Sequence, residues 1–240
     1  LYIAGTYGTD FANYKSIEFT GEGVHKMSLS SRWTIANMGV ELGAKFALFA
    51  YDNKTAEFLA GRTTAAFTPV TSDCDAVFES RHSLDVSTLR PLVACPHEVG
   101  NVHLARDLAD IRIAQAFLGS CTGGRFEDLK IAADILRGRK VAPHVRLIVM
   151  PASQEVYREA LTSGVLHDLI DADASIGPCS CGPCSGYHSG LLAANERCVS
   201  SSSRNFRGRM GSADSEIFLA SPATVAASAL TGYIADPSEL

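Results

Sequence analysis

Residues 114–150, AQAFLGSCTGGRFEDLKIAADILRGRKVAPHVRLIVM, decide the fold, because they predict a strand, a helix and a second strand in succession. The first strand, 114–118, is apolar and leads into Gly119-Ser120-Cys121. A helix from about 124 to 137 follows, and residues 145–150 predict another buried strand. Strands that alternate with helices favour a parallel sheet. Ligands bind beyond the carboxyl ends of such strands, which is where Cys121 is expected. The helix has one apolar face, made by Phe126, Leu129, Ala133 and Leu136.

The same alternation continues on both sides of this segment. We expect strands at 14–19, 45–50 and 197–200, and helices at 31–42, 54–59, 153–163 and from Ser221 to Gly232. The segment PHEVGN, residues 96–101, is typical of a turn, and we expect a domain boundary near residues 95–100. The sequence therefore predicts an α/β protein of two three-layer α/β/α domains with mainly parallel sheets. Residues 1–97 form the first domain, and residues 98–240 form the second.

Composition excludes several classes of protein. The 240 residues are 46% hydrophobic, which is enough to bury a sizeable core. The net charge of -5 does not favour binding to nucleic acid or to an anionic membrane. No run of about 18 apolar residues predicts a membrane span. Seven cysteines, an odd number, indicate a reducing compartment: the cytoplasm or, in a eukaryote, the mitochondrial or plastid matrix. Because the chain begins with Leu1, we expect it to lack an N-terminal portion.

The motif Cys181-Gly182-Pro183-Cys184 has the C-x-x-C spacing that lets two thiolates reach one metal centre. A thioredoxin-like redox pair has the same motif, but it needs an aromatic-capped strand before the motif and a long helix after it. A structural zinc site would need further ligands, for which Cys121, Cys179 and His188 are candidates.

The third interpretation is a [4Fe–4S] cluster held by Cys121, Cys181 and Cys184. Three ligands leave one iron open to act as a Lewis acid. Cys179 offers an alternative pairing within C-S-C-G-P-C, or could itself occupy the open iron.

Two arginines follow the cysteine motif in a loop. Arg204 and Arg209 are five residues apart, so two guanidinium groups could face one dianion, each contributing about 1.5–3 kcal/mol. The alternative is a solvated basic loop, since Arg197 and Arg207 are nearby.

On the helix expected at 31–42, Asn37 and Glu41 are spaced i,i+4 and share a face. They are either ordinary surface residues or a proton-transfer pair.

Six segments, in this order, carry a resemblance to a known family. They are YKSIEFTGEGV, TIANMGVELGAK, FLGSCTGGRFEDLKIAADILRGRKVAP, VRLIVMPASQEVY, CGPCSG and RNFRGRMGS. With them the chain resembles, over essentially its whole length, the large subunit of isopropylmalate and homoaconitate dehydratases within the aconitase superfamily.

The resemblance implies a function in which Cys121, Cys181 and Cys184 ligate a [4Fe–4S] cluster. Ser203, Arg204 and Arg209 would then bind the substrate, and Asn37 and Glu41 would be catalytic. The implied reaction is reversible dehydration and isomerisation of an anionic hydroxy di- or tricarboxylate, as in leucine biosynthesis. The implied partner is a small swivelling subunit, in a heterodimer or heterotetramer. A non-catalytic iron or redox sensor on the same scaffold is the alternative.

The sequence departs from the family pattern at three points. Ser203 stands where the family usually has Asn, and Gly123 stands where Asn usually follows Ser-Cys-Thr. The family's first domain and its swivelling domain have no counterpart in the chain. We therefore expect the middle two domains of a catalytic subunit, inactive without the missing parts.

Overall fold

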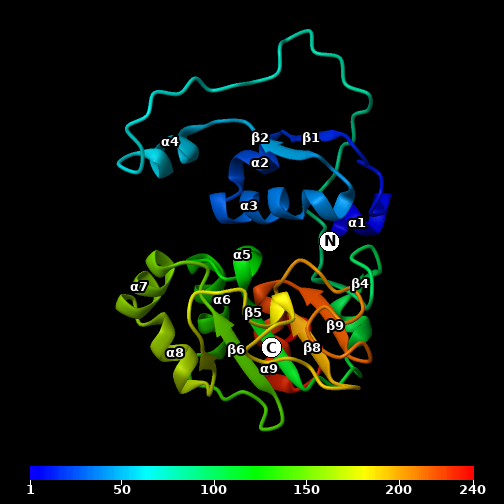
Figure 1. Ribbon diagram of the computed structural model, residues 1–240, viewed down its shortest axis with the longest axis vertical. Coiled ribbons are helices and arrows are strands. Elements are labelled where there is room, and N and C mark those ends of the chain that lie inside the picture. The colour runs from blue at the N-terminus through cyan, green and yellow to red at the C-terminus, as the bar shows by residue number, and fades with distance from the viewer. The chain divides into compact units, whose positions relative to one another are not determined.

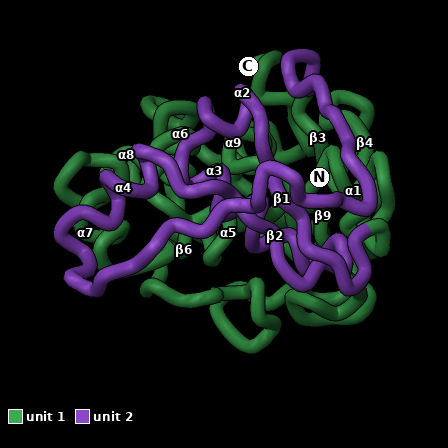
Figure 2. Tube along the Cα trace, turned by 90° about the horizontal axis from the view of Figure 1, so that it is seen from above, with its two compact units in different colours: residues 1–11, 90–240 green, residues 12–89 purple.

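The computed structural model describes residues 1–240 (Figure 1). The chain forms two compact units, coloured separately in Figure 2. Unit 1 contains residues 1–11 and 90–240, and unit 2 contains residues 12–89. None of the helices has the length and apolar character that would be needed to cross a membrane.

Unit 1 is built on a seven-stranded sheet with the strand order β4-β3-β9-β8-β5-β6-β7. The pairings from β9 to β7 are parallel, whereas β3 runs antiparallel to both β4 and β9. This confirms the α/β class with a mainly parallel sheet. All five residues of β5 are buried, as expected for a strand covered on both faces. The strands are β3 (Leu92–Ala94), β4 (Val102–Leu104), β5 (Gln115–Gly119), β6 (Arg146–Met150), β7 (Ser175–Ile176), β8 (Arg197–Ser200) and β9 (Glu216–Ala220).

Two α-helices of unit 1 begin after a serine whose side chain caps them. The Ser153 side chain accepts a hydrogen bond from Val156 N, and Ser221 does the same for Thr224 N. The helix predicted at 153–163 is observed as Gln154–Thr162, and a second helix begins directly after Gly164. The α-helices are α1 (Tyr2–Tyr7), α5 (Ser120–Gly123), α6 (Phe126–Leu136), α7 (Gln154–Thr162), α8 (Val165–Asp171) and α9 (Pro222–Thr231). The 3-10 helices are η2 (Ala105–Leu108), η3 (Gly182–Ser185) and η4 (Pro237–Glu239).

The two faces of this sheet are covered differently. Side chains alternate along each strand, so Leu118 joins the main core with α6, α8 and α9, while Phe117 points to the other face. Loop 177–195 and η3 lie over that second face: Gly182 approaches Phe117, and Gly190 approaches Ile148. The sheet therefore has long helices on one face and mostly irregular polypeptide on the other.

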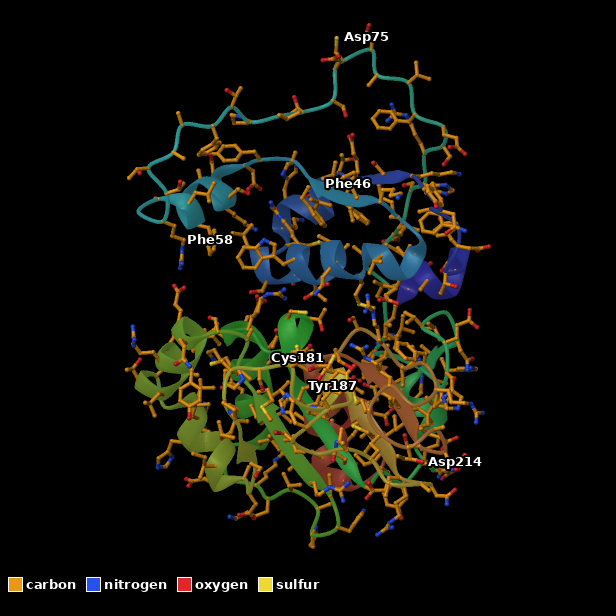
Figure 3. All side chains as sticks on the ribbon, viewed as in Figure 1. Phe46, Phe58, Asp75, Cys181, Tyr187 and Asp214 are labelled. Atoms are coloured by element: carbon orange, nitrogen blue, oxygen red, sulfur yellow. The ribbon has the colours of Figure 1, made fainter.

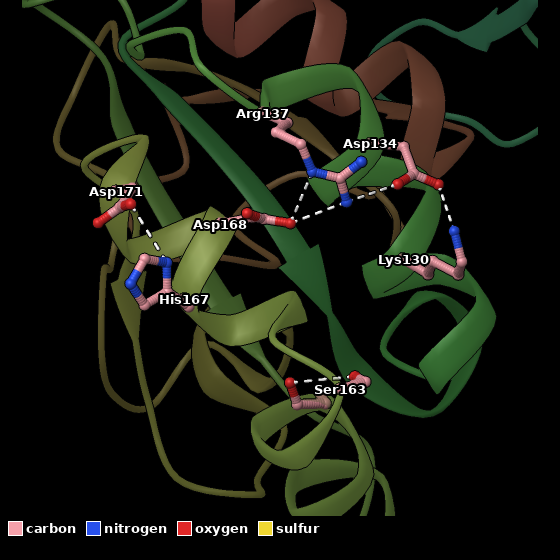
Figure 4. A network of polar contacts seen from close by, with 8 residues as sticks. Lys130, Asp134, Arg137, Ser163, His167, Asp168 and Asp171 are labelled. Atoms are coloured by element: carbon pink, nitrogen blue, oxygen red, sulfur yellow. Dashed lines mark hydrogen bonds and ion pairs between the residues drawn. The ribbon is translucent and has the colours of Figure 1, made fainter.

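A polar network joins α6 to α8 at the surface of unit 1 (Figure 4). Arg137 donates hydrogen bonds of 2.9 and 2.8 Å from Nε and Nη2 to the Asp168 carboxylate. The same guanidinium reaches Asp134, which also pairs with Lys130. These groups are largely exposed, so we expect each ion pair to add less than about 1 kcal/mol.

Unit 2 has a parallel pair of strands, β1 (Ser16–Phe19) and β2 (Phe46–Phe49). The helix expected at 31–42 is α-helical only as far as Met38 and continues as a 3-10 turn. Gly39 stands at that change, where a Cβ atom would lie 2.6 Å from Ala47 Cβ, so glycine permits close packing on β2. No helix or strand is formed between residues 60 and 89. The helices of unit 2 are α2 (Glu22–Lys26), α3 (Leu29–Met38), η1 (Gly39–Leu42) and α4 (Asn53–Leu59).

A buried ion pair joins two helices of unit 2. Arg32 Nη2 lies 2.6 Å from Asp52 Oδ2, and the Arg32 side chain is only 3% exposed. The hydrogen bond from Arg32 holds the pKa of the Asp52 carboxyl well below its usual value. Asp52 also caps α4 by accepting a hydrogen bond from Thr55 N.

The division between the units differs from the one expected from sequence. We expected domains of residues 1–97 and 98–240, whereas packing divides the chain after Phe11 and again before Arg90. Residues 90–97 lie in unit 1 because β3 pairs with β4 and β9 in the large sheet. Helix α1 lies in the same unit, where Gly5 approaches Val102 of β4.

Candidate functional site

Cys121 lies on the sharp turn that joins β5 to α5 and is exposed. The preceding Ser120 has a φ of 71°, an uncommon conformation for a residue other than glycine. The end of β8 supports this turn through Ser201. Its Oγ accepts a hydrogen bond of 3.0 Å from Gly119 N, and its carbonyl oxygen accepts one of 3.1 Å from Thr122 Oγ1.

The loop that carries Cys181 and Cys184 folds over the same end of the sheet. A Cβ atom on Gly119 would lie 2.9 Å from Phe117 Cε2, and one on Gly182 would lie 3.3 Å from that atom. Met150 is a second shared neighbour, since either Cβ atom would come within 3.0 Å of its side chain. In Figure 3, Cys181 lies at the end of the sheet where α5 is drawn. The structure therefore brings the two predicted cysteine segments to one end of the sheet.

Cys184 is the buried member of the predicted trio, at 7% exposure, whereas Cys181 is exposed. Burial raises the pKa of the Cys184 thiol. The Arg209 guanidinium and the Ser202 hydroxyl lie close to its sulfur, and both neighbours oppose the rise in pKa. A positive charge and a hydroxyl group therefore stand beside one sulfur and partly offset the effect of burial on its pKa.

Arg209 is held at the edge of this loop. Its carbonyl oxygen would lie 2.7 Å from a Cβ atom on Gly186, and its guanidinium carbon is 5.3 Å from the centre of the Phe206 ring. Arg209 Nε is buried and has no hydrogen-bond partner. An unpaired buried donor is costly, so an anionic group next to Cys184 would relieve that cost.

The neighbouring residues of the arginine loop are anchored by Asn205, which is 1% exposed. Its Nδ2 donates a hydrogen bond of 2.8 Å to the carbonyl oxygen of Cys95. Ser203 and Arg204 are half-buried beside it. This anchoring means that the predicted substrate-binding segment is a folded loop of unit 1.

Asn37 and Glu41 lie in unit 2 and are both half-buried. Asn37 is in α3, but Glu41 is in the 3-10 turn η1 that follows. They are therefore not on one face of a single α-helix, as their spacing predicted, because the backbone tightens at Gly39.

The remaining cysteines have distinct environments. Cys198 is fully buried, and burial raises its pKa to about 12, as expected for an apolar core residue. Cys179 is half-buried with a pKa raised by burial, and Cys74 is exposed. No group of three or more His, Cys, Asp or Glu side chains surrounds a point where one metal ion could be held. In a [4Fe–4S] cluster each thiolate binds a different iron, so its ligands need not converge on one point.

The chemistry of the donor set is compatible with a cluster. Two separate segments supply three thiols, and an unpaired buried guanidinium donor stands beside one of them. Sequence reasoning missed Ser201 and Ser202. The informative pattern was a run of hydroxyl residues directly after an apolar strand, at the end of the sheet where ligands bind.

Comparison with known proteins identifies the family. The model of the aconitase family (aconitate hydratase) matches residues 1–232. The chain belongs to the aconitase family. Among the relatives of this aconitase-family chain, a 3-isopropylmalate dehydratase large subunit of Clostridium botulinum is 47% identical over 237 residues, 99% of the chain.

Two further relatives of this aconitase-family chain are also named as large subunits of 3-isopropylmalate dehydratase. The 3-isopropylmalate dehydratase large subunit 1 of Methanopyrus kandleri is 50% identical over 237 residues, also 99% of the chain. The 3-isopropylmalate dehydratase large subunit of Moorella thermoacetica is 45% identical over all 240 residues. The chain spans 57% of the length of each of these three relatives.

Proposed function

We propose that this chain is the cluster-bearing part of a [4Fe–4S] hydro-lyase large subunit. Its substrate class is an anionic hydroxy di- or tricarboxylate, such as isopropylmalate, homocitrate or methylmalate. Its partner is a small swivelling subunit. The large-subunit names of the relatives support the partner, and the family supports the reaction class.

The observation that carries the proposal is the surroundings of Cys184. Cys184 is buried beside the Arg209 guanidinium, whose Nε has no acceptor. The loop that carries Cys184 packs on Phe117 and Met150, as the Cys121 turn does. Cys121, Cys181 and Cys184 would hold the cluster. When bound, it would supply a Lewis-acidic iron for the substrate hydroxyl and carboxylate oxygens.

The chain's own residues would bind and orient the substrate. Arg204 and Arg209 would hold carboxylates through paired N–H groups, which restricts the rotation of the substrate in the site. Ser203 would offer its hydroxyl to the same molecule. Asn37 and Glu41 keep the catalytic roles implied by the family, with a Glu41 carboxylate oxygen as the proton carrier.

Anaerobic reconstitution with iron and sulfide tests the cofactor. We expect a brown protein with about four irons per chain, because three thiolates retain the whole cubane. A colourless protein that binds zinc in a stoichiometric amount would overturn the proposal. The variant C198A is the matched control, since this buried cysteine is not among the proposed ligands and should leave iron content unchanged.

Activity is tested in the presence of a small subunit and the remaining large-subunit sequence of a relative. Loss of water from 3-isopropylmalate, followed by the absorbance of the unsaturated product, is the expected result. An iron-loaded protein that dehydrates none of the proposed hydroxy acids under these conditions would instead favour a sensor role.

A further inference from the structure

Three consecutive buried hydroxyls follow the apolar part of β8. Ser200 is 0% exposed, Ser201 is 6% exposed and Ser202 is 4% exposed. Buried hydroxyl groups are costly unless they are hydrogen-bonded, so a run of three at the end of a strand needs partners. Ser200 provides one of them internally, since its Oγ accepts a hydrogen bond of 3.1 Å from Ser202 N.

The Ser201 hydroxyl lies inside the turn that carries Cys121. It accepts a hydrogen bond from Gly119 N and has the carbonyl oxygens of Phe117, Gly119 and Gly123 within 3.4 Å as possible acceptors. One small side chain therefore contacts the backbone on both sides of Cys121. Removing it would leave Gly119 N without its partner inside the fold.

Gly123 closes the turn from the other side. A Cβ atom added there would overlap the Ser201 side chain and lie 2.6 Å from the Ser201 carbonyl oxygen. The departure from the family pattern at residue 123 is thus accompanied by direct contact between this glycine and Ser201. The Gly123 backbone packs directly on Ser201, in the space that a larger side chain at position 123 would occupy.

The Ser202 hydroxyl contacts the other cysteine segment. It is close enough to the Cys184 sulfur to lower the pKa of that thiol, and it lies 2.8 Å from Ser200 Oγ. Ser201 and Ser202 are neighbours in the chain, so a single residue step separates the contact with the Cys121 turn from the contact with Cys184.

We infer that Ser201 and Ser202 are positioning residues that set the Cys121 turn and the Cys184 sulfur at a fixed spacing. This inference rests on the proposed function, because the spacing matters most if both cysteines bind one cluster. A hydroxyl donor to a ligand sulfur also stabilises the added electron of a reduced cluster and raises its reduction potential.

The test compares S201A, S202A and S202T with S228A, a matched control. Ser228 is as deeply buried and hydrogen-bonded as the other serines, but it lies in α9 on the helical face. In the iron-free protein, hydrogen exchange at the Gly119 amide should be about tenfold faster in S201A, because that amide loses its acceptor. S228A should leave this rate unchanged.

The reconstituted proteins provide the second measurement. S202A should lose iron to a chelator about tenfold faster than the parent and show a more negative reduction potential. S202T keeps the hydroxyl and should restore both values.

Unchanged potential and iron loss in S202A, or equal changes in S228A, would overturn the inference. If the parent protein takes up no iron, the proposed function is wrong. If the parent is loaded with iron but S202A has the same reduction potential and iron loss, only the inference about the serines is wrong.

Discussion

The Arg209 guanidinium lies beside the sulfur of Cys184 and lowers the pKa of that thiol, so a residue expected to bind substrate is also a neighbour of a proposed cluster ligand. The two residues are 25 positions apart in the sequence and belong to different motifs. Arg209 can therefore serve both the sulfur and a carboxylate, because a guanidinium has five N–H donors in a fixed plane. One of these, Nε, is still unpaired in the folded chain.

Replacing Arg209 with lysine should weaken substrate binding and iron retention together. Lysine keeps the charge but loses the planar fork, so we expect KM to rise at least about tenfold. Iron loss to a chelator should also be faster. R204K is the matched variant and should raise KM with no change in iron retention. Unaltered iron retention in R209K would argue against a role for the Cys184 contact.

Adding a methyl group at Gly123 should distort the Cys121 turn. The methyl group introduced by G123A would clash with Ser201, so we expect a loss of about 1–3 kcal/mol in the free energy of unfolding. Iron content after reconstitution should fall as well. G23A is the control, because its Cβ would meet only Val86 at 3.6 Å, an ordinary contact. Chemical denaturation of the two iron-free variants provides the comparison.

The thiols should react with iodoacetamide according to their exposure. In iron-free protein, Cys74, Cys121 and Cys181 are exposed and should be labelled fast. Cys198 should stay unlabelled, because burial raises its pKa to about 12 and excludes the reagent. After reconstitution only Cys74 should remain reactive among the exposed three. Peptide mass spectrometry measures each site, and fast labelling of Cys121 in iron-loaded protein would contradict its role as a ligand.

Asp128 should make unfolding depend on pH between about 4 and 6. Burial raises the pKa of this carboxyl to about 6, while the unfolded chain has the ordinary value of about 3.9. The folded state then binds more protons in this window, so the contribution of Asp128 to stability falls as pH rises. At pH 7 the full cost is on the order of 3 kcal/mol, since a tenfold change in a proton-binding constant corresponds to about 1.4 kcal/mol.

The variant D128N should remove this cost while keeping an acceptor for Arg125 N, which Asp128 caps at 3.0 Å. We expect D128N to unfold at higher denaturant concentration than the parent at pH 7 and at a similar concentration at pH 4. A parallel pH dependence in both proteins would show that Asp128 titrates normally.

The ion pair between Arg32 and Asp52 should contribute measurably to the stability of unit 2. R32A would leave the Asp52 carboxylate without its partner, at a cost of about 1–3 kcal/mol, because Asp52 is partly exposed and water can replace part of the lost contact. The Asp52 pKa is lowered, so its contribution is present above the unfolded pKa and disappears only as pH falls below it. R62A, which changes an arginine stacked on Phe58, should cost much less. Hydrogen exchange within α3 and α4 distinguishes the two variants.

The sequence by itself determined the elements with strong periodicity or clear punctuation. Strand β5, helix α6 and strand β6 lie within a residue or two of their predicted places, because buried strands and an amphipathic helix carry their own patterns. Helix α9 begins after Ser221 and ends at Gly232 as its capping residues predicted. The order of the motifs was enough to predict the family, and the match to the family model confirms that prediction.

Tertiary structure decided what depends on contacts between distant segments. The change from α to 3-10 helix at Gly39 follows from its close packing on Ala47, a partner that no local pattern reveals. Strand β3 joins the large sheet by pairing with β9, so its place was hidden until the fold brought residues 93 and 220 together. The contacts of Ser201 and Ser202 belong to the same class. A hydroxyl's function is set by the atoms packed around it, and for these serines those atoms come from residues 117–123 and 184.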